Sequence, residues 1–165
     1  MPEAAVKIED PEALQKKMEE LQKAEDTVFM KGYQDVSMPD LISRGYILHQ
    51  AEITPGFTVK LRTLRKREEL DVKRRVANYN GAQIYVVDEL NVDALAFALV
   101  EINGVPQPDP VKEFDKAKAN IVELPDALVV AILEEYRNLN KALVILVKGS
   151  SKNSLARHLL GRESA

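Results

Sequence analysis

The chain has no cysteine and no tryptophan, and only nine of its 165 residues, four Phe and five Tyr, are aromatic. Without cysteine there is no disulfide framework, no thiolate nucleophile and no cysteine-based metal site. The seven glycines are scattered, and no glycine-rich phosphate-binding loop occurs. We therefore expect no cofactor, no metal site and no enzymatic activity.

Histidine is also scarce. His49 and His158 are the only two and lie far apart in sequence, which argues against a histidine-rich metal site. We expect His49 in a strand and interpret it as a surface or partly satisfied histidine, because no Ser or Asp motif of a catalytic triad surrounds it.

A hydrophobic run long enough to cross a membrane is missing as well. The most apolar short stretch, residues 142–147 (ALVILV), has six residues, whereas a membrane-spanning helix needs about 20. The first thirty residues place acids early and contain no long apolar segment, which does not favour a secretory signal. We expect a cytosolic or particle-bound protein without membrane contact.

Aliphatic and charged side chains dominate the composition. Hydrophobic residues make up 45% of the chain and charged residues 30%, with a net charge of −3. The length predicts one domain with a substantial core, and a core built mainly from Leu, Val, Ile and Ala favours helices. The small net charge gives no global attraction to a polyanion.

A capped amphipathic helix is predicted near the N-terminus. Asp10 is an N-cap candidate, Pro11 suits the first helical position, and Gly32 is a candidate stop. An apolar stripe follows at helical spacing, interrupted by Glu25. Its members are Leu14, Met18, Leu21 and Val28. This stripe fits one partner surface, and the sequence leaves open whether that surface is the protein's own core or a neighbouring subunit.

The segment that follows predicts a β-hairpin. Residues 46–53 and 57–61 flank Pro55-Gly56, which is a turn signal, and residues 57–61 alternate apolar and polar side chains. Thr63 is then the candidate N-cap of a helix that runs to about Tyr79.

Helical patterns dominate the remainder. Residues 83–87 are ambiguous between helix and strand, and we favour the helix. Residues 92–102 (VDALAFALVEI) predict a buried helix that stops at Asn103-Gly104. Asp109-Pro110 predicts the start of a short helix to about Ala119, and Leu124-Pro125-Asp126 that of a long one. The apolar stripe of the long helix is Leu128, Ile132, Leu139, Leu143 and Leu146.

The predicted fold is α+β and mostly α-helical, with a small β-hairpin packed on a helical domain. We place an N-terminal helical arm at residues 1–36, the central domain at 37–148 and a C-terminal tail at 149–165. The tail carries three apolar residues, which we call the tail trio, and we expect them to contact a partner surface. The trio is Leu155, Leu159 and Leu160.

Residues 60–75 contain eight bases and three acids and raise the alternative of nucleic-acid binding. Helical i,i+4 spacing pairs most of the bases with acids, and no aromatic side chain interleaves to stack on bases. Lys66 and Arg74 are the two helix bases with no i,i+4 acid. The predicted pairs are Arg65–Glu69, Glu69–Lys73, Arg67–Asp71 and Asp71–Arg75.

Several short motifs resemble small tail and baseplate assembly proteins of contractile-tailed bacteriophages. They are Ser43-Arg44-Gly45, the strand Val59-Lys60-Leu61-Arg62-Thr63-Leu64, the helix start Arg67-Glu68-Glu69, the stretch 101–106 (EINGVP), and the helix from Leu124-Pro125 through Tyr136 and Leu139. The family pattern has threonine where this chain has Arg65, which is why the helix cap is placed at Thr63.

The resemblance implies a non-enzymatic structural or chaperone-like role at the baseplate, hub or tail-tube end. The implied partners are other tail or baseplate proteins within an oligomeric assembly, and the implied location is the virion tail or the host cytoplasm during assembly. We take the N-terminal stripe, the tail trio, Arg44, Lys66 and Arg74 as candidate partner contacts. The alternative is a nucleic-acid-associated accessory protein that uses residues 60–75.

Overall fold

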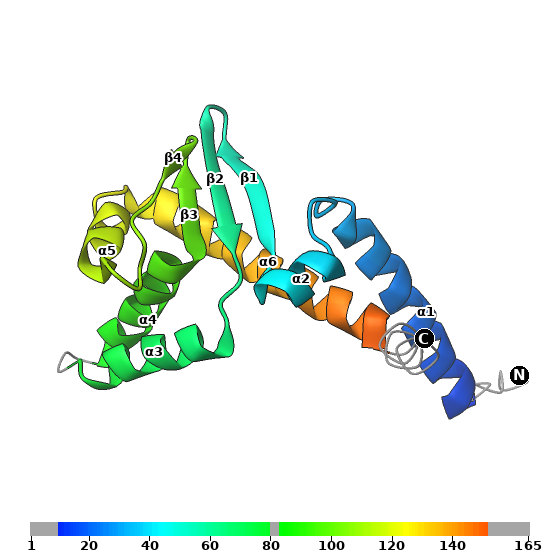
Figure 1. Ribbon diagram of the computed structural model, residues 1–165. Coiled ribbons are helices and arrows are strands. Elements are labelled where there is room, and N and C mark those ends of the chain that lie inside the picture. Colours follow the sequence, from blue (N-terminus) through cyan, green and yellow to red (C-terminus); the bar gives the residue numbers. More distant parts are fainter. Residues whose placement is uncertain (1–9, 80–82, 152–165) are drawn as a thin grey trace, which may run out of the picture. The chain divides into compact units, whose positions relative to one another are not determined.

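The computed structural model describes residues 10–79 and 83–151 (Figure 1). Contacts divide these residues into two compact units, residues 10–34 and residues 35–151.

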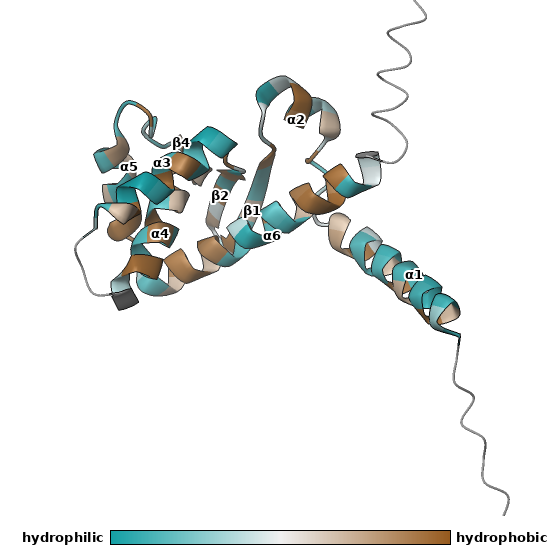
Figure 2. Cartoon of the chain, turned by 90° about the horizontal axis from the view of Figure 1, so that it is seen from below, coloured by the Kyte–Doolittle hydropathy of each residue, from teal (hydrophilic) through white to brown (hydrophobic). Residues whose placement is uncertain are grey.

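The first unit is built on α1 (Pro11–Met30), which starts where the sequence predicted. The Asp10 carboxylate caps the helix by accepting a hydrogen bond from the Glu12 amide at 3.2 Å. After the helix ends, Tyr33 stacks on Phe29 with ring centroids 5.0 Å apart. Figure 2 shows α1 as a mainly hydrophilic helix with separate hydrophobic positions, and no residue of α1 is buried.

The second unit holds the other helices and all the strands of the described residues. In chain order they are α2 (Met38–Arg44), β1 (Leu48–Thr54), β2 (Phe57–Arg62), α3 (Lys66–Ala77), α4 (Gln83–Ala98), β3 (Leu99–Ile102), β4 (Val105–Pro106), α5 (Phe114–Val122) and α6 (Asp126–Ser151). The prediction of a mostly helical α+β fold is confirmed.

The sheet is antiparallel, with strand order β1-β2-β3-β4. The predicted hairpin is present: β1 pairs with β2 across the Pro55-Gly56 turn, with His49 opposite Leu61 and Ala51 opposite Val59. The sheet is larger than predicted, because β3 and β4 add a second hairpin beside β2.

The predicted helix over residues 92–102 is wrong for its last four residues. Helix α4 begins at Gln83, which resolves the earlier ambiguity in favour of helix, and ends at Ala98. The chain then passes directly into β3, which pairs with β2. Asn103 (φ 49°) and Gly104 (φ 77°) form the two-residue turn to β4, a conformation typical of Asn-Gly hairpins.

The predicted start of the short helix at Asp109-Pro110 is also wrong. The Asp109 carboxylate accepts a hydrogen bond from the Val111 amide at 2.9 Å, which closes a turn, and α5 begins only at Phe114. Helix α6 begins at Asp126 as predicted and continues through Ser151, beyond the boundary placed at residue 148.

Helix α6 covers one face of the sheet (Figure 1). His49 lies opposite Leu61 in register, and its ring reaches Glu135 on α6. Since cross-strand neighbours point to the same face, this face packs on α6. The fully buried large apolar side chains of the unit include Ile47, Val59, Leu61, Leu95, Ile121, Ile132 and Leu139.

Candidate interaction surface

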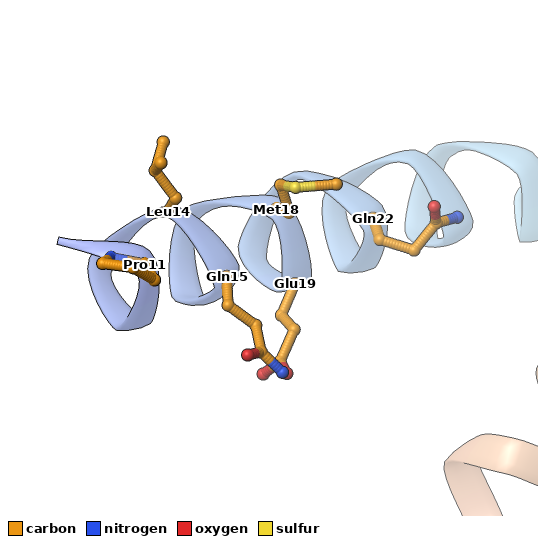
Figure 3. Close-up of a pocket in the computed structure, with 6 residues that line it drawn as sticks. All are labelled: Pro11, Leu14, Gln15, Met18, Glu19 and Gln22. Carbon is orange, nitrogen blue, oxygen red and sulfur yellow. The ribbon is translucent and has the colours of Figure 1, made fainter. Parts of the chain in front are cut away.

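The predicted apolar stripe of α1 is exposed along its whole length. Its four side chains, Leu14, Met18, Leu21 and Val28, are between 44% and 69% exposed. In Figure 3 Leu14 and Met18 project from one side of the helix, whereas Gln15 and Glu19 project from another. The stripe is therefore an apolar surface available to a partner.

A concavity lies along the N-terminal half of this stripe. The described residues that line it, Pro11, Leu14, Gln15, Met18, Glu19 and Gln22, all belong to α1 (Figure 3). Because a single helix cannot enclose a small molecule, we interpret these residues as a contact surface rather than as a ligand pocket.

The Ser-Arg-Gly turn joins α2 to the start of α3. The Arg65 guanidinium donates to the Arg44 carbonyl from Nη2 at 2.9 Å and from Nε at 3.3 Å. Gly45 has φ 77°, and a Cβ placed there would lie 3.2 Å from Arg65 Nε. Glycine at this position therefore permits both the turn and the close approach of Arg65. We call this connection between α2 and the start of α3 the joint. Arg44, predicted as a partner contact, takes part in it through its carbonyl.

Thr63 is not the helix cap that the sequence predicted. Its side chain is buried and its hydroxyl oxygen accepts a hydrogen bond from the Ile47 amide at 3.2 Å. The residue before the first turn of α3 is Arg65, whose amide donates to Glu68 Oε2 at 2.8 Å. Thr63 instead pairs with Ile47, the residue before β1, because its amide also donates to the Ile47 carbonyl at 3.1 Å.

A buried ion pair completes the joint. Arg62 donates two hydrogen bonds to Glu68, both 2.8 Å long, and the two side chains are only 11% and 4% exposed. The guanidinium groups of Arg62 and Arg65 both lie over the Tyr46 ring, 4.9 and 5.0 Å from its centroid. Burial alone would raise the pKa of Glu68, but the hydrogen bonds from Arg62 and from the Arg65 amide lower it below its ordinary value.

The second concavity, of about 390 Å³, lies beside this joint. Its lining includes Tyr46, Arg62, Arg65 and Glu68 together with residues 107–111. Of the charged groups that line it, Arg62, Arg65 and Glu68 already bond to one another or to the Arg44 carbonyl, and Asp109 accepts from the Val111 amide. They are therefore poorly placed to recognise a charged ligand.

The predicted i,i+4 ladder on α3 is replaced by i,i+3 pairs. Lys66 lies 3.2 Å from Glu69, and Arg74 lies 3.3 Å from Asp71. The two bases expected to lack an acid thus have one, and both remain about three-quarters exposed. Such exposed pairs contribute little to stability, typically ~0.2–1 kcal/mol.

Several bases of the segment 60–75 serve the fold. Arg62 and Arg65 belong to the joint, and the Arg75 guanidinium lies 3.7 Å from the centroid of the Phe114 ring on α5. Arg67 and Lys73 are exposed and make no ion pair with another described residue. Three of the eight bases of this segment, Arg62, Arg65 and Arg75, thus serve the fold.

A polar cluster around His49 was not predicted from the sequence. His49 is buried, with Nδ1 2.7 Å from Asp35 Oδ1 and Nε2 3.3 Å from Glu135 Oε1. The other Asp35 oxygen accepts the Gln50 amide at 3.0 Å. No local pattern could have predicted it, because the three side chains come from a loop, β1 and α6 and meet only in the folded chain.

The carboxylates of Asp35 and Glu135 raise the pKa of the His49 imidazole. Burial alone would lower the pKa of His49, but hydrogen bonds to Glu135 and Asp35 and the charges of both acids outweigh it and raise the pKa. A protonated ring donates from both nitrogens and satisfies both acids. The two ion pairs of His49 therefore connect β1 to the loop before α2, through Asp35, and to α6, through Glu135.

The unfolding free energy should fall as the pH rises through the raised pKa of His49. The folded state holds this proton more tightly than the unfolded chain, so the stabilisation is complete below the ordinary value of 6.5 and is lost above the folded-state pKa. Urea unfolding at a series of pH values from about 5 upward should show this slope. We expect His49→Gln to remove it, and an equal slope in that variant would contradict the prediction.

Within residues 10–79 and 83–151, no three His, Asp or Glu side chains are placed to hold a metal ion. In the same part of the chain, none of the helices has the length and apolar character needed to cross a membrane. The tail residues Leu155, Leu159 and Leu160, predicted as partner contacts, and His158 lie outside the described residues.

Comparisons with protein families, with curated proteins and with solved structures found no match to this chain.

Proposed function

We propose that the chain is a non-enzymatic assembly protein that binds other subunits through the apolar stripe of α1. The exposure of this stripe is the observation that carries the proposal. Most helical stability in proteins comes from the packing of an amphipathic face rather than from intrinsic propensity, so we expect α1 to pack on a surface. Burying its four apolar side chains would contribute on the order of 6–10 kcal/mol before the costs of ordering and association are subtracted.

We further propose that the assembly is a contractile phage tail, at the baseplate, hub or tail-tube end. The resemblance of the Ser-Arg-Gly, V-K-L-R-T-L and R-E-E segments supports this proposal. In this chain the same segments supply Gly45, Arg62, Thr63 and Glu68, which hold the joint between α2, the first hairpin and α3. The motifs that carry the resemblance are thus residues on which the fold depends.

Mass spectrometry of purified particles and of tail-assembly intermediates tests this placement. The sample should come from cells that express the chain together with a complete set of contractile-tail proteins. We expect the chain in the particles if it is a structural subunit, or in the intermediates alone if it acts as a chaperone. Its absence from both would contradict the proposal.

The alternative function, nucleic-acid binding through residues 60–75, gives a separate prediction. We expect Lys66→Ala with Arg74→Ala to leave DNA affinity unchanged, because each base is already paired with an acid on α3. Arg67→Ala with Lys73→Ala is the matched comparison, since these exposed bases have no such pair among the described residues.

Fluorescence anisotropy with duplex and single-stranded DNA at physiological salt is the measurement. The assembly proposal predicts no tight binding by any of these proteins. Tight binding by the unmodified chain that falls steeply with salt, and that Arg67→Ala with Lys73→Ala weakens, would favour the nucleic-acid function instead.

A further inference from the structure

The outward side of α6 carries a ladder of exposed residues with the same spacing as the stripe of α1. The ladder recurs at intervals of four and three residues and consists of Val130, Glu134, Arg137, Lys141, Val144 and Lys148. Val147 is exposed beside its C-terminal part. Figure 2 shows hydrophobic residues toward both ends of α6 with a hydrophilic stretch between them, and the C-terminal group is residues 142–147 (ALVILV).

The two helices differ in charge. Residues 136–151 of α6 contain three bases and no acid, a net charge of +3. Helix α1 contains five acids and three bases, a net charge of −2. One acid of α1, Glu25, lies within the apolar stripe itself, between Leu21 and Val28. A surface that accepts this stripe must therefore offer both apolar side chains and a base for Glu25.

We infer that α1 of one copy packs antiparallel on the C-terminal half of α6 in a second copy, an inference that rests on the proposed function. With Leu21 opposite Val144, the antiparallel register places Met18 opposite Val147. The same register brings Glu25 within one residue of Lys141 and sets Val28 against the aliphatic part of Arg137. In the parallel register Glu25 would also face a base, Lys148, but Met18 would face Lys141, so only the Leu21–Val144 contact would be apolar.

Pairing between two α1 helices satisfies this chemistry less well. In an antiparallel pair with Met18 against Leu21, the stripe spacing sets Glu25 of each helix against Leu14 of the other. A carboxylate would then be buried without a base, and two helices of net negative charge would repel. The ladder of α6 offers a base near Glu25, so the carboxylate is not left unpaired. Its net positive charge also attracts α1 instead of repelling it.

The proposed contact joins two different surfaces of the same chain. Such a heterologous contact propagates from copy to copy and builds a ring or an open chain of subunits. This geometry suits a protein that takes part in a tail assembly.

A charge exchange between the two helices tests the inference. Sedimentation velocity over a range of concentrations should show that the unmodified chain self-associates. We expect Glu25→Lys alone and Lys141→Glu alone each to weaken association by about tenfold or more, because each places like charges opposite each other. An equimolar mixture of the two variants should restore association, since every contact between unlike copies again joins opposite charges.

Glu20→Lys is the matched control, because it makes the same charge change on α1 outside the stripe, and it should leave association unchanged. Rescue only when both substitutions are in one chain, and none on mixing, would place the contact within a single copy and overturn the inference. An unmodified chain that stays monomeric would overturn it as well. If neither variant weakens association but Leu14→Asp with Leu21→Asp does, α6 is not the partner, whereas the proposed role of the stripe stands.

Discussion

Replacing Glu68 with alanine should lower the unfolding free energy by about 3–5 kcal/mol, the usual cost of removing one partner of a buried ion pair. The substitution leaves the Arg62 guanidinium, only 11% exposed, without its carboxylate. It also removes the acceptor of the Arg65 amide at the first turn of α3. Urea unfolding measures the loss.

The neighbouring Glu69→Ala is the matched control. Its carboxylate makes an exposed pair with Lys66, so the expected loss is at most ~1 kcal/mol. Because the pKa of Glu68 is lowered in the folded state, its stabilisation is present above the ordinary glutamate pKa and is lost as the pH falls through the folded-state value. Equal losses in the two variants would show that the Arg62–Glu68 pair does not hold the joint.

Local signals in the sequence were enough to predict the elements with strong boundaries. Asp10-Pro11 fixed the start of α1, and Pro55-Gly56 fixed the hairpin, because each of these pairs favours one backbone geometry. The alternation from Phe57 to Leu61 gave the face that packs on α6, since one face of a sheet is set by every second residue.

The strand β3 could not be predicted in the same way. Residues 92–102 are almost continuously apolar, and such a run fits a buried helix and a buried strand equally well. Asn103-Gly104 was interpreted as a helix stop, although the same pair is a strong hairpin signal. Pairing with β2 decided the conformation, and that pairing is a tertiary contact.

The role of the basic segment was likewise decided by tertiary contacts. Helical spacing alone cannot reveal that Arg65 turns back to the Arg44 carbonyl or that Arg62 pairs with Glu68 above Tyr46. The ion pairs of His49 with Asp35 and Glu135 also depend on tertiary contacts. By contrast, the spacing of the α1 stripe correctly identified which side chains share one face of that helix, because they lie within a single element.

The double substitution Leu14→Asp with Leu21→Asp is expected to abolish association through α1 without unfolding residues 35–151. Two carboxylates in the stripe replace the apolar contact with charges that would have to be buried without partners. The effect on residues 35–151 should be small, since both leucines are exposed in the folded chain. Lys16→Ala with Lys23→Ala is the control, because it changes the net charge of α1 by the same amount on the opposite side of the helix.

The central claim is that the stripe of α1 is an interface between subunits, and sedimentation velocity combined with a thermal melt of the Leu14→Asp, Leu21→Asp variant tests it most directly. The account predicts a normal cooperative melt and a monomer at every concentration at which the unmodified chain and the lysine control associate. Loss of the cooperative melt would mean that α1 covers the protein's own core. An unchanged melt with unchanged association would equally contradict the claim.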